Sequence, residues 1–227
     1  SGRLGVLDAS ECPPTFSVSP NLVIGIIAGG KKALYKSIEG AEDDLKLASS
    51  DFKKYKINEK DTVIGITTSG TTPYVIKILK EAKKIGAFTS IITSNQINNK
   101  KYIDVKIECI VGPEIITGST RMKAGTATKM ILNIISTTTM IKLNKVYKNL
   151  MVDLKINNNK LLNRAITIIN SITDLDVIES KRLLEKANGE VKTAILMHLK
   201  SKCYNEAKKM LIKKNGNLRN SLKENNE

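Results

Sequence analysis

Two acidic motifs near the start of the chain carry carboxylates that could move protons. Glu11 lies in the sequence DASECPP at residues 8–14, and Glu42 lies in EGAEDD at residues 39–44. A pair of carboxylates is the least that a site needs to remove a proton from a sugar carbon and to protonate the leaving group. Acidic residues are common on any surface, so the residues around these two decide whether they form a site.

A hydroxyl-rich loop, TTSGTTP at residues 67–73, is the second candidate for chemistry. It lies between a predicted buried strand and a predicted helix, so Thr67, Ser69 and Thr72 would bring hydroxyl groups to a helix N-terminus. Gly70 would let the backbone approach a ligand closely. Hydroxyl groups and free backbone N–H groups at a helix N-terminus bind a phosphate dianion. A simple helix cap needs one hydroxyl, so we favour a phosphate-binding loop.

Four β-branched runs predict the strands that must position this loop. The first three are apolar on both faces, as buried parallel strands are, and the fourth alternates, as an edge strand does. Helical patterns lie between them, and this alternation predicts an α/β fold with a parallel sheet. The strand runs are 22–28, 62–67, 89–93 and 104–111, and the helical patterns are 40–55 and 73–84.

A long helical pattern over residues 119–143 follows, and beyond residue 149 the chain shows helical patterns only. We therefore expect two domains, residues 1–150 and residues 157–227, joined by a polar linker rich in asparagine. The helices expected in the second domain cover 159–169, 177–186, 190–199, 204–213 and a segment from about 218.

Other acidic residues fit structural roles. Glu39, Asp43 and Asp44 would place negative charge in the first turn of the helix predicted at 40–55, where the helix dipole favours it. Glu114 follows a proline and fits a turn.

Charge and composition limit the partners of the chain. Its 227 residues carry a formal net charge of +15, which would permit contact with nucleic acid. The lysines are spread along the chain, aromatic residues make up 4% and tryptophan is absent, so platforms for stacking bases are scarce. We expect no nucleic-acid partner and interpret the charge as favouring small anions.

The cysteines, the histidine and the apolar runs indicate the cellular compartment and argue against membrane and metal sites. Three cysteines far apart in the sequence fit a reducing compartment such as the cytoplasm better than a disulfide framework. No apolar run reaches the roughly 18 residues that span a bilayer, so we expect no membrane association. With one histidine, His198, and no Cys-x-x-Cys motif, we expect no metal site.

Several motifs together resemble one known family. DASECPP, EGAED, SGTTPYV at 69–75 and VGPEIITGSTRMKAGT at 111–126 resemble the N-acetylmuramic acid 6-phosphate etherases, which belong to the sugar isomerase (SIS) superfamily. The resemblance continues through KVY at 145–147 and NLMVD at 149–153, and it covers nearly the whole chain. Several long motifs in the same order make a chance match a poor explanation.

The resemblance implies a three-layer αβα SIS fold of the flavodoxin-like kind with a small C-terminal helical bundle. It implies a lyase without a cofactor that converts N-acetylmuramic acid 6-phosphate to N-acetylglucosamine 6-phosphate and D-lactate in peptidoglycan recycling. In the ring-opened sugar the C1 aldehyde acidifies the C2 proton, so one group removes this proton while another protonates the departing lactyl oxygen. By motif position these groups are Glu11, assigned as the acid, and Glu42, assigned as the base, with the reverse assignment open.

The resemblance also implies where the substrate lies. Ser1 would touch the sugar or the phosphate, and the hydroxyl-rich loop would hold the phosphate. Arg121 and Lys123 would support anion binding or a subunit contact, and a purely structural role is equally open. A cytoplasmic homodimer is implied, with a sugar phosphate as its small-molecule partner. The loop residues assigned to the phosphate are Thr67, Ser69, Gly70 and Thr72.

The family pattern differs from this sequence at its start. In the family a helical region and a hydrophobic central strand precede the SGRLG segment, whereas this sequence begins at Ser1 of that segment. Loss of several buried side chains at about 1.5–3 kcal/mol each amounts to on the order of 10 kcal/mol. We therefore expect an inactive or poorly active fragment of an etherase. A non-catalytic sugar-phosphate-binding regulatory SIS module and an aldose–ketose isomerase are the other open functions.

Overall fold

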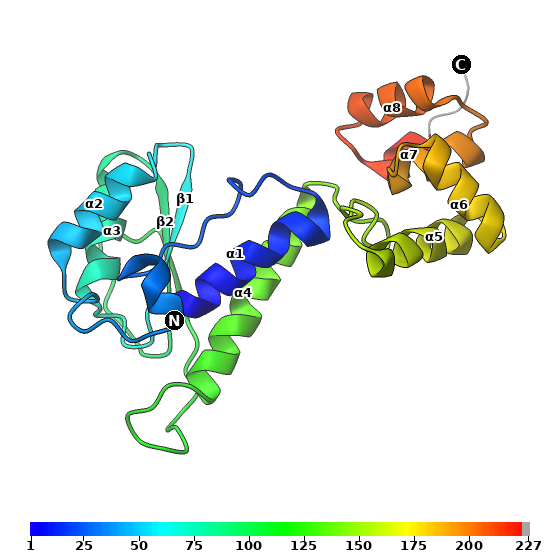
Figure 1. Cartoon of the computed structure of the whole chain (residues 1–227). Coiled ribbons are helices and arrows are strands. Elements are labelled where there is room, and N and C mark those ends of the chain that lie inside the picture. The colour runs from blue at the N-terminus through cyan, green and yellow to red at the C-terminus, as the bar shows by residue number, and fades with distance from the viewer. Residues whose placement is uncertain (224–227) are drawn as a thin grey trace. The chain divides into compact units, whose positions relative to one another are not determined.

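The computed structural model describes residues 1–223, shown as a ribbon in Figure 1. They form two compact units, the first made of residues 1–10 and 24–134 and the second of residues 11–23 and 135 onward. The domain limits at 150 and 157 stay a prediction, and residues 224–227 of the predicted second domain lie outside the described range.

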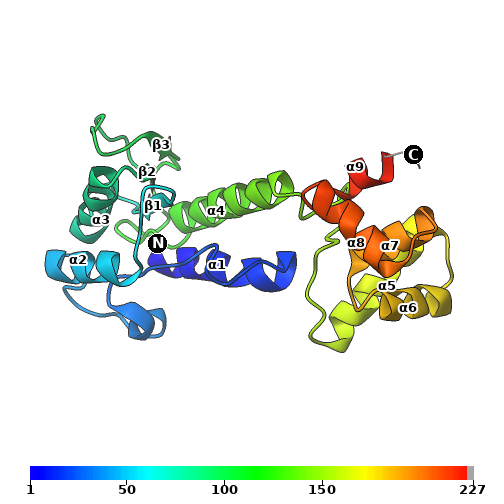
Figure 2. The same ribbon diagram turned by 90° about the horizontal axis from the view of Figure 1, so that it is seen from above.

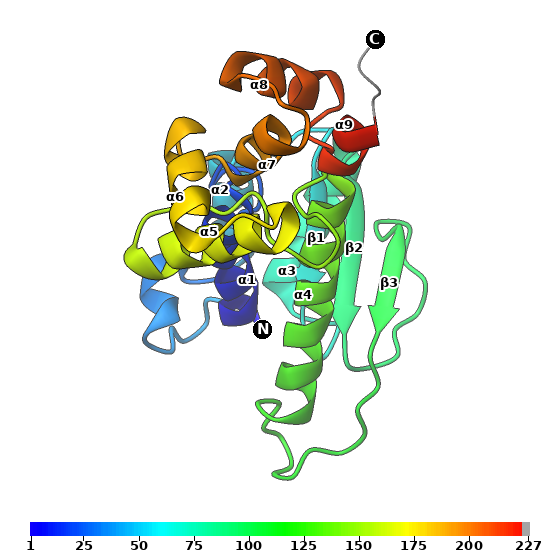
Figure 3. The ribbon, with the colours of Figure 1, turned by 90° about the vertical axis from the view of Figure 1, so that its right-hand side faces the viewer.

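A parallel sheet lies in the first unit, with its strands side by side in the order β1-β2-β3 (Figure 3). The central strand, β2, is hydrogen-bonded on both sides, with its residue Ser90 opposite Ile64 of β1 and opposite Val105 of β3. The sheet confirms the α/β class and the last three of the four predicted strands. The strands are β1 (Thr62–Ile66), β2 (Phe88–Thr93) and β3 (Val105–Glu108).

The first predicted strand, at residues 22–28, is wrong, because this segment is not part of the sheet. It runs beside helix α1 (Gly2–Phe16), where a Cβ atom on Gly25 would lie only 2.5 Å from the Cα of Val6. Ile26 packs against a buried cluster on two helices of the same unit. The apolar side chains of the segment therefore pack against helices, which an apolar run does not distinguish from a strand.

The helices of that cluster are α2 (Leu45–Lys54) and α3 (Pro73–Lys84), which pack against one another (Figure 2). α3 also packs closely on β1, because a Cβ atom on Gly65 would lie 2.6 Å from Cγ1 of Val75. The bounds of α3 confirm the helix predicted at 73–84, with proline in the first helical position. The buried residues of the cluster are Ala48, Tyr74 and Ile78.

Two further elements are η1 (Gly30–Leu34), a short 3-10 helix, and α4 (Lys123–Lys142). α4 begins later than the predicted pattern at 119–143. No helix among the described residues is both long enough and apolar enough to cross a membrane.

Helices make up the C-terminal part of the second unit and confirm the helical patterns predicted there. Side-chain caps define several of their starts: Asn158 accepts a hydrogen bond from the Leu161 N–H, and Asp176 forms a capping box with Glu179. The helices are α5 (Asn159–Thr173), α6 (Val177–Lys186), α7 (Val191–Leu199), α8 (Tyr204–Lys213) and α9 (Leu218–Lys223).

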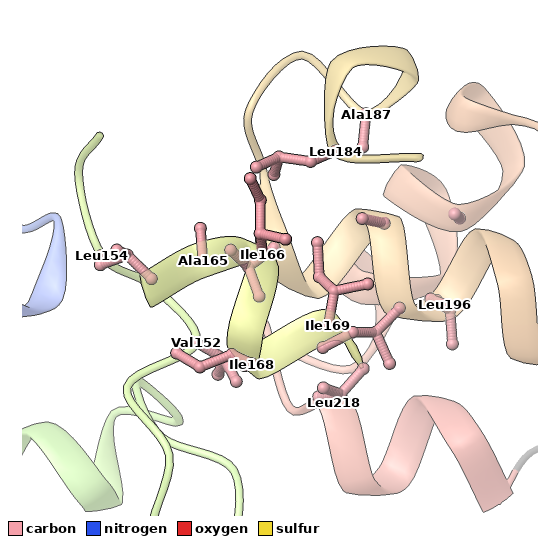
Figure 4. Close-up of a cluster of buried hydrophobic side chains, with 14 of the residues drawn as sticks. Val152, Leu154, Ala165, Ile166, Ile168, Ile169, Leu184, Ala187, Leu196 and Leu218 are labelled. Atoms are coloured by element: carbon pink, nitrogen blue, oxygen red, sulfur yellow. The ribbon is translucent and has the colours of Figure 1, made fainter. Parts of the chain in front are cut away.

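Aliphatic side chains fill the core of these helices, where Ile169 of α5, Leu196 of α7 and Leu218 of α9 belong to one buried cluster (Figure 4). One charged group, Lys192, is buried at the edge of this core, and its side chain is 8% exposed. Its Nζ donates to the Asn144 and Gly216 carbonyls at 2.8 Å and lies 2.7 Å from Asp153. The three partners neutralise and hydrogen-bond the ammonium group, which explains how it tolerates burial.

Candidate active site

The hydroxyl-rich loop connects the carboxyl end of β1 to the N-terminus of α3, as the sequence predicted. Thr67 lies at its base and is 3% exposed. Its Oγ1 is 2.7 Å from Oγ1 of Thr72 and 3.3 Å from Oγ of Ser69, so one buried hydroxyl joins both ends of the loop. Ser69 Oγ in turn accepts from the N–H of Thr71 at 3.1 Å and from its hydroxyl at 2.9 Å.

Backbone donors in the same loop are free. Among the described residues, nothing accepts a hydrogen bond from the backbone N–H of Ser69, Gly70 or Thr72. Gly70 has a φ of +75°, and a residue in the left-handed region turns successive N–H groups toward one side of a loop. Thr72 precedes α3 without a side-chain cap. Free N–H groups, hydroxyls and the positive end of a helix are the features with which proteins bind anions.

Ser1 and Glu42 lie near this loop in the first unit. Oγ of Ser1 is 3.5 Å from Oγ1 of Thr68, and the Glu42 carbonyl accepts a hydrogen bond of 2.9 Å from the N–H of Tyr74 in the first turn of α3. The Glu42 side chain is exposed, so a substrate bound at the loop could reach it.

The acids around Glu42 have separate roles. Asp44 is the N-cap of α2, and its Oδ1 accepts from the N–H groups of Lys46 and Leu47 at 2.8 and 2.9 Å. This cap sets the helix start, so the predicted helix start at residue 40 and the predicted first-turn positions of Glu39 and Asp43 are wrong. Both of those residues are exposed, and they precede α2.

Glu11 is exposed on α1, next to Cys12, which is 2% exposed and packs in the interior. Pro13 and Pro14 follow in the last turn of the helix, where they cannot donate to the preceding carbonyls. Glu11 belongs to the second unit and Glu42 to the first. The joint action of the two carboxylates at one substrate therefore stays a prediction.

Glu114 was predicted to lie in a turn. Its side chain caps the N-terminus of α4, although the residue lies well before that helix in the sequence. Its two carboxylate oxygens accept from the N–H groups of Lys123 and Ala124, each at 3.0 Å. These backbone hydrogen bonds lower the pKa of Glu114, that from Ala124 most. Lys123 Nζ donates to the Pro113 carbonyl at 2.8 Å, so Lys123 has a structural contact, and Arg121 is exposed.

The sequence did not lead us to predict the residues at the carboxyl end of β2 as part of this region. The Thr68 carbonyl accepts hydrogen bonds from Oγ1 of Thr93, the N–H of Ser94 and Nδ2 of Asn95. The available signal was their place after a parallel strand, since the carboxyl ends of neighbouring strands share one edge of a sheet. No group of three or more potential metal ligands lies together among the described residues.

Comparisons with known proteins give two matching domain models and a group of relatives that share one name. The model of the glucokinase regulatory protein N-terminal SIS domain matches residues 1–83, and the model of the C-terminal lid domain of that protein matches residues 148–192. The chain is 53% identical over 223 residues to N-acetylmuramic acid 6-phosphate etherase 1 of Bacillus licheniformis, covering 98% of this chain and 73% of that protein.

Two further relatives are also named as N-acetylmuramic acid 6-phosphate etherases. The N-acetylmuramic acid 6-phosphate etherase of a Geobacillus species is 54% identical over 98% of this chain and 76% of its own length. The corresponding protein of Clostridium beijerinckii is 51% identical over 99% of this chain and 74% of its own length.

Proposed function

We infer the reaction from the family: the chain belongs to the N-acetylmuramic acid 6-phosphate etherases. It is a lyase that cleaves N-acetylmuramic acid 6-phosphate to N-acetylglucosamine 6-phosphate and D-lactate. The fold is a SIS-type α/β fold with a parallel sheet. The observation that carries the proposed mechanism is the loop at 67–72, where free N–H groups and hydroxyls surround the N-terminus of a helix.

The loop binds the 6-phosphate, with its negative charge facing the N-terminus of α3. Thr67 is buried and joins the loop ends, so its hydroxyl holds the shape of the site, while the N–H groups of Ser69 and Gly70 donate to phosphate oxygens. Ser1 lies beside Thr68 and contacts the sugar or the phosphate. Arg121 is exposed and supports anion binding or a subunit contact.

Glu42 is the base in this proposal. Its backbone is hydrogen-bonded to the first turn of α3, which keeps its exposed carboxylate near the bound phosphate. In the ring-opened sugar it removes the C2 proton, the C3–oxygen bond breaks, and Glu11 gives a proton to the departing lactyl oxygen. Water then adds at C3 of the unsaturated aldehyde, and C2 regains a proton, which completes the conversion.

Proton exchange at C2 separates the roles of the two carboxylates. In deuterated water, Glu11→Gln is expected to lose lactate release and keep exchange at C2, whereas Glu42→Gln is expected to lose both. Glu39→Gln is the matched control, because Glu39 is an exposed acid in the same segment and precedes α2. The opposite pattern in the two variants would reverse the assignment, and full activity in either would remove that residue from the mechanism.

A non-catalytic regulatory module is the second candidate, because both matching domain models describe a regulatory protein. The relatives named as etherases favour the enzyme. Binding of N-acetylmuramic acid 6-phosphate without lactate release would support the regulatory reading.

A cytoplasmic homodimer is the proposed assembly. Its support is an exposed apolar face on α4, where Met130, Ile134 and Ile141 are each at least half exposed. Light scattering of the wild-type chain and of Ile134→Glu tests this, since a charge at the contact is expected to give monomers.

A further inference from the structure

The hydroxyl-rich loop at residues 67–72 is the proposed phosphate loop. Near its start, the backbone carbonyl of Thr68 accepts three hydrogen bonds. The donors to the Thr68 oxygen are Oγ1 of Thr93 at 3.0 Å, the N–H of Ser94 at 3.1 Å and Nδ2 of Asn95 at 2.8 Å. The N–H of Asn95 also donates to Oγ1 of Thr93 at 3.1 Å. All three donors come from the segment that leaves the carboxyl end of β2.

The three hydrogen bonds to the Thr68 carbonyl also fix the direction of the Ser69 N–H group, which belongs to the same peptide bond. All peptide bonds among the described residues are trans, so the N–H of Ser69 points away from the Thr68 carbonyl and hence away from Asn95. That N–H and the one of Gly70 make no hydrogen bond to a described residue. Holding the carbonyl on one side therefore presents free donors on the other.

Ile97, in the same segment after β2, restricts the position of the loop at Gly70. A Cβ atom on Gly70 would lie 2.5 Å from Cγ2 of Ile97, so the two segments are in close contact. Ile97 is itself held on both sides: its N–H donates to Oε1 of Glu108 at 2.9 Å and its carbonyl accepts from Nζ of Lys106 at 2.8 Å. The hydrogen bond from Ile97 and that from Lys106 lower the pKa of Glu108.

We propose that residues 93–97 form a clamp that positions the phosphate loop, with Asn95 as its main positioning residue. The proposal rests on the proposed function for the identity of the ligand. Asn95 does not contact the phosphate and acts through the Thr68 carbonyl. β3 anchors the clamp through Lys106 and Glu108, so an edge strand supports a site to which it contributes no ligand.

Removal of the Asn95 amide is expected to weaken phosphate binding and to spare the chemical step. Asn95→Ala leaves the Thr68 carbonyl with two donors and lets the peptide rotate, so affinity for inorganic phosphate should fall about 10-fold. KM for N-acetylmuramic acid 6-phosphate should rise by the same factor, with kcat within about 2-fold, because the C2 and C3 chemistry lies with other groups. Thr93→Val, which removes the second side-chain donor, should act in the same direction.

The test uses the full chain, titrated with inorganic phosphate by calorimetry, with steady-state lactate release and thermal melting measured in parallel. Asn98→Ala is the control, because Asn98 is exposed in the same segment and makes no hydrogen bond to the described residues. Should Asn95→Ala not fold, Thr93→Val carries the same comparison.

The outcomes separate the clamp from the proposed function. Unchanged phosphate affinity in Asn95→Ala and Thr93→Val, or an equal loss in Asn98→Ala, would overturn the clamp while lactate release by the wild type upholds the function. A loss confined to kcat would also overturn it. Wild-type phosphate binding that the two variants weaken, without any lactate release, would support the clamp and remove the function. A wild type that releases lactate but binds no phosphate would overturn the clamp alone, and one that neither binds phosphate nor releases lactate would overturn both.

Discussion

Substitution of Gly70 by alanine tests the geometry of the phosphate loop in two separable ways. The φ of +75° at Gly70 is left-handed, and an alanine held there is strained by about 1–2 kcal/mol. The added Cβ would also lie 2.5 Å from Cγ2 of Ile97, and overpacking of this kind destabilises by about 1–3 kcal/mol. Gly70→Ala is therefore expected to lower the free energy of unfolding by about 2–5 kcal/mol.

A double-mutant cycle with Ile97→Ala separates the two effects. Removal of the Ile97 side chain eliminates the steric contact and leaves the backbone strain, so adding Gly70→Ala to Ile97→Ala should cost only the strain of about 1–2 kcal/mol, against about 2–5 kcal/mol when Gly70→Ala is made in the wild type. Urea unfolding of the wild type, both single variants and the double variant measures this. Phosphate titration should show weak binding in both variants that carry alanine at position 70, because the strained φ persists in each.

Additive losses in the cycle would refute the steric part of the reasoning, because they would show that the two side chains do not meet. A Gly70→Ala variant as stable as the wild type, with normal phosphate affinity, would refute the left-handed conformation as well.

Further predictions concern three charged groups. Lys192→Met should destabilise the chain by about 3 kcal/mol in urea unfolding, because it leaves Asp153 without its closest cation; wild-type stability would contradict this. Glu114→Gln should lower the melting temperature measured by circular dichroism, since an anionic cap at the start of α4 is lost, and an unchanged value would argue against the cap. Asp104 has a pKa of about 2, mainly because of its hydrogen bond from Lys83, so its stabilising effect is present above about pH 4 and is lost as the pH falls toward 2. The urea midpoints of wild type and Asp104→Asn should therefore differ at pH 5 and converge near pH 2.

Local patterns predicted the elements next to the phosphate loop well. The run at 62–67 is β-branched and bounded by turn residues, and Pro73 marks the first position of α3, so strand, loop and helix could be placed from the sequence. The segment at 22–28 has the same apolar character but packs beside α1, because burial against a helix and burial in a sheet favour the same side chains.

Roles that depend on contacts distant in sequence could not be predicted. Glu114 caps residues nine and ten positions away, and no spacing rule for helix caps reaches that far. Asn95 lies in a polar segment that fits an ordinary loop, and only the adjacency of β1 and β2 brings its amide to the Thr68 carbonyl. The position of the hydroxyl-rich loop between a strand and a helix could be predicted from the sequence, whereas the contacts that support the loop required the fold.

The hydrogen bond from the Tyr74 N–H to the Glu42 carbonyl fixes the distance between the Glu42 backbone and the N-terminus of α3. Tyr74 is the first residue of α3 able to donate, since Pro73 has no N–H, and its hydroxyl is bound to Asp51 of α2. Tyr74 thus links the backbone of the proposed base to the first turn of α3 through its N–H and to α2 through its hydroxyl. Under the proposed function, this fixed separation is expected to favour a sugar whose phosphate and C2 are as many bonds apart as in a 6-phosphate, and a 1-phosphate of the same sugar is expected to bind without C2 beside Glu42.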